Sequence, residues 1–170
     1  MRKKWILLLL VFLVLSVIMS ITVFCHNKLV DVSDLIKKEK PEDLVLTIYY
    51  MEPNVLTDIP ISVDMIKSWG DKVEITGKEL EEHIAAFKQI NKKTLKLVRI
   101  IPANVNVRMY YVLESKKNGK LFDVAVWGNI ANETLMFNGV EIKNNRIFYD
   151  VVLPFLPEDI AGKYGEPLWE

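Results

Sequence analysis

The chain opens with an uninterrupted apolar run. Residues 5–25 contain no charged side chain, no glycine and no proline, and their only polar side chains are Ser16, Ser20 and Thr22. As a helix, this run would measure about 31 Å, enough to cross the hydrocarbon core of a bilayer. Serine and threonine hydroxyls can bond back to helix carbonyls, so they are compatible with lipid. The pattern predicts a transmembrane helix over residues 5–25.

Basic residues precede this run. Arg2, Lys3 and Lys4 make residues 1–4 a positively charged leader, and no acidic side chain occurs before the run ends. Positive charge favours retention on the cytoplasmic side of the membrane. We therefore expect a single-pass protein of the cell membrane, with a cytoplasmic N-terminus and an extracytoplasmic C-terminal domain. The lipid bilayer is its first expected partner.

Two alternatives to an uncleaved anchor concern the end of the run. In a secretory signal, Val23 and Cys25 would occupy the −3 and −1 positions, and the product would be secreted. Signal peptides usually have a shorter apolar region, which favours the anchor. In a lipoprotein, Cys25 would be acylated after cleavage, but Phe24 is bulky where such signals carry a small residue. All three fates remain open, with the anchor favoured.

Residues 26–43 are polar and lysine-rich, and this composition predicts a juxtamembrane linker. One short helix is expected around residues 33–39, with Ser33 as its cap. The lysines are close enough to the membrane to meet headgroups, but the interspersed acidic residues favour a solvated stretch. The extracytoplasmic domain is then expected over residues 44–170, a usual size for one domain with its own core.

Most of this domain has the pattern of strands. Residues 44–51 are rich in β-branched and aromatic side chains and predict the first strand. Residues 55–68 fit no single period. Further strands are expected at residues 72–76, 95–101, 107–114, 120–127, 134–137 and 140–151. Asn-Gly pairs at 118–119 and 138–139 favour tight hairpins, so these strands should be antiparallel.

One segment has the period of a helix. Thr76 and Glu79 are spaced as a capping box, in which each side chain bonds the other residue's backbone amide. An apolar stripe follows at helical spacing: Leu80, Ile84, Phe87 and Ile90. The domain is therefore expected to be α+β, with a helix packed on a mainly antiparallel sheet. That arrangement is similar to cystatin-like folds, a likeness of architecture that carries no function.

Charge and cysteine content exclude several classes of function. Lys and Arg together number 22, as do Asp and Glu, but the three basic residues of the leader leave everything after it with a net charge of −3. A mildly acidic domain is a poor nucleic-acid binder. The single cysteine, Cys25, excludes an intramolecular disulfide and a cysteine-rich metal site.

No motif for catalysis, cofactor binding or metal binding stands out. His83 and Glu79 share a helix face, but no second histidine completes a zinc pattern, so we expect a packed or ion-paired His83. Glu114, Asp123 and Asp150 could serve an enzyme only by meeting in one cleft with His83. We favour the other interpretation, that they lie on the polar faces of a half-exposed sheet. No nucleophile elbow or phosphate-binding glycine loop is present, and we predict no cofactor.

Aromatic residues give the best indication of binding. Tyr50 and Tyr110 could line an exposed surface with Trp127, because tyrosine and tryptophan combine apolar area with a polar tip. Packing within the core or across strands explains the same residues. Asn132 begins a glycosylation sequon, which has meaning only in a eukaryotic secretory pathway.

The leader, the apolar run and a domain rich in Lys, Asn and Ile resemble small membrane-anchored extracytoplasmic proteins of uncharacterised families in Gram-positive bacteria. Three segments within roughly the last 60 residues carry the resemblance: Arg108-Met-Tyr-Tyr-Val, Phe137-Asn-Gly-Val-Glu, and Phe148-Tyr-Asp with Pro154-Phe-Leu-Pro-Glu-Asp159. Such families imply no activity.

Three hypotheses follow. The first, which we favour, is a non-enzymatic module that binds a protein partner or ligand at the outer membrane face. The second is an extracytoplasmic enzyme that uses carboxylates or His83. The third is an accessory subunit of a membrane complex that acts through its transmembrane helix.

Overall fold

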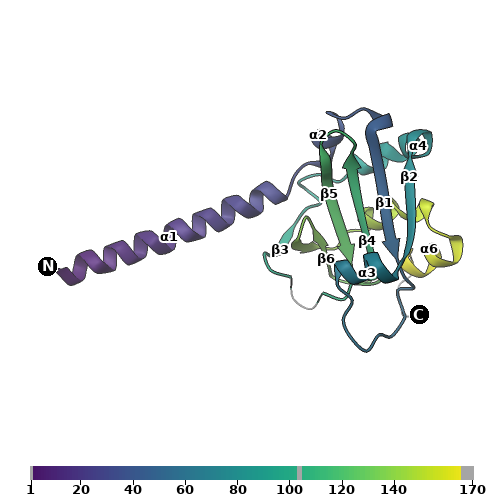
Figure 1. The fold of residues 1–170 in the computed structure, drawn as a ribbon. Coiled ribbons are helices and arrows are strands. Elements are labelled where there is room, and N and C mark those ends of the chain that lie inside the picture. The colour runs from purple at the N-terminus through teal and green to yellow at the C-terminus, as the bar shows by residue number, and fades with distance from the viewer. Residues whose placement is uncertain (1, 103–104, 166–170) are drawn as a thin grey trace.

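A computed structural model describes residues 2–102 and 105–165, without the side chains of residues 2–4, 6–8, 18, 22 and 24–27. The described chain is α+β: a seven-stranded antiparallel sheet carries several helices, and one long helix projects from the domain (Figure 1). The predicted fold class is confirmed at this level, although more helices cover the sheet than the single one expected.

The sheet has the order β2-β1-β4-β5-β6-β7-β3. Its strands are β1 (Leu44–Tyr50), β2 (Asp71–Thr76), β3 (Leu97–Arg99), β4 (Met109–Ser115), β5 (Gly119–Val126), β6 (Thr134–Phe137) and β7 (Val140–Lys143). Both Asn-Gly pairs join antiparallel neighbours, as predicted. In the second, Asn138 and Gly139 have φ of 48° and 77°, the backbone that a two-residue hairpin needs for its turn.

The helices are α1 (Arg2–Lys28), α2 (Val32–Ile36), α3 (Val63–Trp69), α4 (Gly77–Phe87), α5 (Ile147–Asp150) and α6 (Glu158–Gly165), with 3-10 turns η1 (Pro41–Asp43) and η2 (Leu153–Phe155). The predicted helix is α4, but its capping box is wrong. Thr76 ends β2, paired with Val45, and its side chain makes no capping bond. Gly77, with φ of 61°, turns the strand directly into the helix.

The main core lies between one face of the sheet and the helices α2, α4, α5 and α6. Aromatic rings fill its centre. Phe122 stacks on Phe137 at 5.7 Å between ring centroids, and Phe87 and Tyr111 lie within 6.4 Å of Phe122. The alternation predicted for these strands explains the arrangement, since every second residue of β4 and β5 points into this core.

A second, smaller core lies on the opposite face of the sheet. There α3 contributes Ile66, and the connector before it contributes Ile61, over Tyr110, Val112 and Ala125. Ser62 caps α3 by accepting a hydrogen bond from the Met65 amide at 3.2 Å. This helix occupies part of the segment whose sequence fits no single period.

The predicted long strand over 140–151 is wrong beyond Lys143. Asn145 interrupts it: its side-chain oxygen accepts a hydrogen bond from the Ile147 amide at 3.1 Å and starts α5. Phe148 and Tyr149 are adjacent and both lie in the main core, which a helical turn allows and a strand does not, since neighbouring side chains of a strand point to opposite faces.

The predicted linker over residues 26–43 is also corrected. Asp31, rather than Ser33, caps α2, and Val32 and Ile36 are buried in the main core. The Val32 amide donates to the carbonyl of Ile90 at 3.2 Å. The domain therefore begins directly after α1, because apolar side chains spaced along this polar stretch pack into the core.

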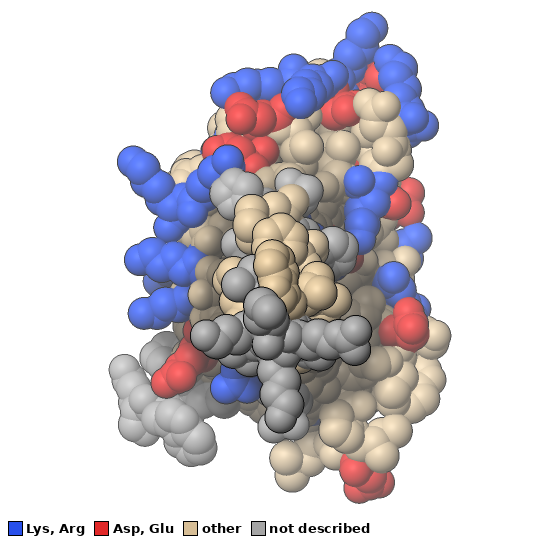
Figure 2. Space-filling model, turned by 90° about the vertical axis from the view of Figure 1, so that its left-hand side faces the viewer, with Lys and Arg blue, Asp and Glu red and all other residues tan. Residues whose placement is uncertain are grey.

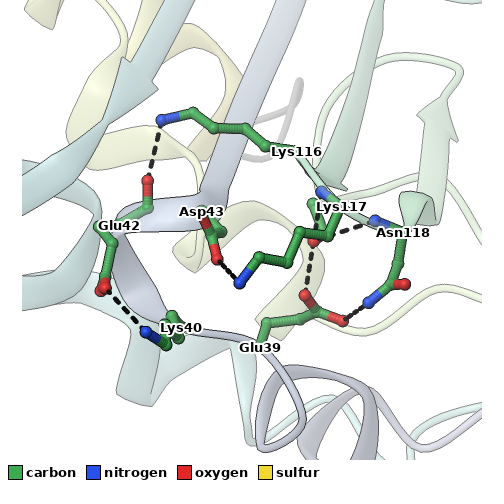
Figure 3. A network of polar contacts seen from close by, with 8 residues as sticks. Glu39, Lys40, Glu42, Asp43, Lys116, Lys117 and Asn118 are labelled. Carbon is green, nitrogen blue, oxygen red and sulfur yellow. Dashed lines mark hydrogen bonds and ion pairs between the residues drawn. The ribbon is translucent and has the colours of Figure 1, made fainter.

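A polar clasp holds the end of this segment to the β4–β5 hairpin (Figure 3). The Glu39 carboxylate accepts hydrogen bonds from Ser115 and from Asn118, the latter at 2.7 Å. Lys117 lies 2.9 Å from the carboxylate of Asp43. The hydrogen bonds from Ser115 and Asn118 lower the pKa of Glu39, and Lys117 lowers the pKa of Asp43.

This clasp predicts an acid-sensitive contribution to stability. A carboxylate with a lowered pKa in the folded chain stabilises the fold above its ordinary pKa, and this contribution is lost as the pH falls through the folded value. We expect the free energy of unfolding to fall below about pH 4.5. In urea titrations, Glu39→Gln should show a shallower fall than the parent chain. An unchanged slope would contradict a role for Glu39.

The helix α1 projects from the domain, and its described apolar side chains are largely exposed, including Leu9 at 68% and Phe12 at 73% (Figure 1). Ser16 and Ser20 donate their hydroxyls to helix carbonyls at 2.8 Å, as predicted. In the part of the chain that the structure describes, no helix meets the combined length and apolarity needed to cross a membrane.

Candidate functional site

The predicted tyrosine surface is not exposed. Tyr50 and Tyr110 are only 7% and 4% exposed, and they lie on opposite faces of the sheet. The β1–β4 register places Tyr49, rather than Tyr50, opposite Tyr110, with 6.2 Å between ring centroids. Trp127 is half-buried beside Tyr110 in the second core. The prediction of an exposed patch formed by Tyr50, Tyr110 and Trp127 is therefore wrong.

Tyr110 has the contacts of a packed residue. Its hydroxyl donates to Asp123 at 3.0 Å, and the ammonium of Lys67 lies 4.6 Å from its ring centroid. Burial and the nearby Asp123 carboxylate raise its pKa above the ordinary value, so the phenol stays protonated. Asp123 also pairs with Lys120 at 3.1 Å. These contacts link β4, β5 and α3.

The residues considered for catalysis do not converge. His83 lies on α4, where it packs edge-on against Phe155 at 4.8 Å. Asp123 lies on the other face of the sheet, and Asp150 pairs with Arg146 on α5 at 3.2 Å. Glu114 shares the face of Asp123, since both alternate with residues of the main core. Among the described residues, no group of three or more His, Cys, Asp or Glu could hold a metal ion.

A cleft of about 520 Å³, lined mainly by polar residues, is the candidate site, and we call it the polar cleft. Three segments line it: Val98 of β3, residues 130 and 132–134 at the start of β6, and residues 143–145 at the end of β7. Its walls offer amides, the Thr134 hydroxyl, one carboxylate and one ammonium group. These groups can hydrogen-bond a polar ligand, but they include no nucleophile paired with a base, so the cleft suits binding.

Buried hydrogen bonds fix the floor of this cleft. The Asn144 side-chain nitrogen donates to the carbonyl of Asn132 at 2.7 Å, and its backbone amide donates to the carbonyl of Glu133 at 2.8 Å. Beneath it, the Tyr149 hydroxyl donates to the carbonyl of Asn129 at 2.8 Å. Burial raises the pKa of Tyr149 to about 12, which keeps this donor protonated. The side-chain oxygen of Asn144 is buried and bonds no described residue.

Arg108 is a buried residue whose role the sequence did not indicate. Only 4% exposed, its guanidinium donates to the carbonyl of Val55 at 3.0 Å, to Thr57 at 3.2 Å and to Asn106 at 2.9 Å. Burial lowers its pKa. All three of these acceptors are neutral. Val55 and Thr57 belong to the connector between β1 and α3, so Arg108 fixes this connector to the sheet.

The base of α1 is bonded to the β6–β7 hairpin. The Asn138 side chain donates to the carbonyl of Lys28 at 2.9 Å, and Leu29 and Val30 pack against the main core. These contacts hold the same face of the domain toward α1. Figure 2 looks onto that face, where Lys and Arg side chains stand on several sides of the helix.

No protein-family model, curated protein or solved structure matches this chain. The resemblance to anchored proteins of Gram-positive bacteria therefore stays a prediction.

Proposed function

We propose that this chain is a single-pass membrane protein whose extracytoplasmic domain is a non-enzymatic binding module. The observation that carries the proposal is the exposure of the apolar side chains of α1. Apolar side chains such as Leu9 and Phe12 are exposed along a helix that projects from the domain. A helix that is apolar all round needs a non-aqueous environment.

The anchor rests on the sequence of residues 5–25 taken as a whole. That sequence includes residues 6–8, 18, 22, 24 and 25, whose side chains lie outside the described part of the chain. The basic leader favours a cytoplasmic N-terminus and hence an outward-facing domain. Cleavage near Cys25 is the alternative, and it would yield a secreted domain.

The binding assignment rests on the polar cleft and on the dispersal of the candidate catalytic groups. Amide and hydroxyl groups beside Glu133 and Lys143 suit a ligand rich in hydrogen-bonding groups, such as an extended peptide. These groups are held in place, since Asn144 donates hydrogen bonds to the backbone carbonyls of Ile130, Asn132 and Glu133. We infer a protein partner at the outer membrane face that inserts such a segment.

A charged double variant tests the anchor. Leu10→Lys with Val14→Lys places two ammonium groups in the middle of the run, each costing about 3 kcal/mol of insertion free energy. We expect most of the protein to move from the carbonate-resistant membrane fraction to the soluble fraction. Leu56→Lys, at a domain position that is 99% exposed, is the control and should stay in the membrane. Equal extraction of both variants would contradict the anchor.

Photo-cross-linking in intact cells tests the binding module. A photoreactive amino acid in place of Glu133, at the rim of the cleft, should give a discrete adduct, and one in place of the exposed Asp159 on α6 should not. The adduct should persist when residues 5–25 are exchanged for an unrelated apolar span. Its loss on that exchange would favour the accessory-subunit hypothesis instead, and equal adducts from both positions would contradict the cleft.

A further inference from the structure

The segment around β3 exposes apolar side chains on the side of the domain next to α1. All three residues of β3 are exposed, and they are followed by Ile100 and Ile101, the latter 81% exposed. β3 pairs only with β7, so it forms an edge of the sheet. Exposed apolar side chains that follow one another on an edge usually mark a contact surface.

These side chains lie beside the helix that we propose as the membrane anchor. Ile100 and Ile101 line a hollow of about 490 Å³ whose other wall is formed by Ser20 and Ile21 of α1. Ile21 precedes the end of the span at residue 25 by four residues, or about 6 Å of helix. If residues 5–25 span the bilayer, Ile100 and Ile101 lie at the boundary between headgroups and acyl chains.

Basic side chains flank this apolar tip, and Glu141 lies opposite Arg99 in the β3–β7 register. The sequence has no acidic residue between Glu82 and Glu114, and Lys96 and Arg99 flank the exposed apolar side chains within this interval. The Lys143 amide donates to the carbonyl of Lys96 at 2.8 Å, which brings a third exposed basic residue next to them. Lys and Arg side chains stand around the base of α1 in Figure 2. Cations at this level of a bilayer meet lipid phosphates.

We propose that residues 96–101 form a second membrane contact, in which Ile100 and Ile101 enter the outer leaflet and Lys96 and Arg99 bind the headgroups of anionic phospholipids. This inference rests on the proposed anchor. Since the chain continues from α1 into the core through Leu29 and Val30 without a free linker, the contact fixes how the domain is turned on the membrane. The polar cleft, which shares Val98 with this segment, then opens next to the lipid surface.

Depth-dependent fluorescence quenching tests the contact in the full chain. Cys25, the only cysteine, is changed to serine, and an environment-sensitive fluorophore is attached at Ile101→Cys, Ile100→Cys, Val14→Cys or Asp159→Cys. Val14 lies in the middle of the proposed span. Asp159 is exposed on α6, which Figure 1 shows on the side of the domain away from α1. The chains are reconstituted in vesicles of phosphatidylcholine and phosphatidylglycerol that carry nitroxide-labelled lipids.

We expect shallow nitroxides to quench labels at 100 and 101 several-fold more than at 159, and deep nitroxides to quench the label at 14. Quenching at 14 with none at 100 or 101 would overturn the contact and leave the anchor standing. No quenching at 14 would overturn the anchor, and the contact with it. The two failures are therefore distinguishable.

The charge contribution has its own measurement. Omission of phosphatidylglycerol should reduce quenching at 101, and so should Lys96→Gln with Arg99→Gln in the anionic vesicles. Both side chains are exposed, so this variant should fold like the parent. Equal quenching at 101 in neutral and anionic vesicles, or in the variant and the parent, would overturn the binding of anionic headgroups.

Discussion

Phe122→Ala is expected to lower the free energy of unfolding by about 3–5 kcal/mol. Phe122 is fully buried at the centre of the main core, where Phe87, Tyr111 and Phe137 surround its ring. Alanine would leave a cavity between the sheet and α4 that these rigid rings can fill only in part. Urea unfolding of the full chain in detergent micelles, followed by circular dichroism, measures the loss.

Leu56→Ala is the matched control for this core variant. Leu56 is 99% exposed in the connector between β1 and α3, so its truncation should change the free energy of unfolding by less than about 0.5 kcal/mol. A Phe122→Ala variant as stable as Leu56→Ala would contradict the packing of the aromatic centre.

Arg108→Met is expected to cost about 2–4 kcal/mol and to release the connector over residues 51–61. Methionine keeps much of the apolar volume but removes every donor, so the carbonyl of Val55 and the side chain of Thr57 lose the donor that Arg108 supplies, while Asn106 keeps its bond from the Ile61 amide. The connector should become the first site of cleavage in limited proteolysis. Arg108→Lys should not restore protection, since one ammonium lacks the planar fork that reaches both sides.

Arg146→Met is the control for this second variant. Arg146 is exposed and pairs with Asp150 along one turn of α5, an arrangement that contributes little. It should leave both the unfolding free energy and the cleavage pattern nearly unchanged. Equal cleavage of the connector in the Arg108 and Arg146 variants would contradict the role of Arg108.

The regular parts of the fold were predictable because each follows from local chemistry. Alternation along β4 and β5 matches their burial on the two faces of the sheet, and the Asn-Gly pairs form the turns expected of them. The stripe from Leu80 to Phe87 is buried on α4. In each case the signal lies within a few neighbouring residues.

The remaining features depend on contacts between distant segments. The tyrosine surface was wrong because alternation within a strand does not give its register against another, and the register pairs Tyr49 with Tyr110. The linker prediction was wrong because the few apolar residues that attach this stretch, among them Val32 and Ile36, stand among many polar ones. Its attachment depends on α4 and the β4–β5 hairpin, which lie far from it in the sequence.

The polar cleft and Arg108 had no local signature. The cleft joins residues near 98, 132 and 144, which come together only through the order of β6, β7 and β3. Arg108 just precedes an apolar strand, where a polar side chain is more commonly solvated. Two of its acceptors, Val55 and Thr57, lie about fifty residues earlier in the chain, in the connector that it fixes.

Protease treatment of intact cells that express the full chain with a C-terminal tag tests the outward-facing anchor most directly. The predicted result is a full-length, membrane-bound protein whose tag is removed from outside without lysis. A tag that is protected until the cells are lysed would place the domain on the cytoplasmic side. A shortened product in the medium would show that the segment ending near Cys25 is a cleaved signal. Either of these results would contradict an extracytoplasmic domain held at the membrane by α1.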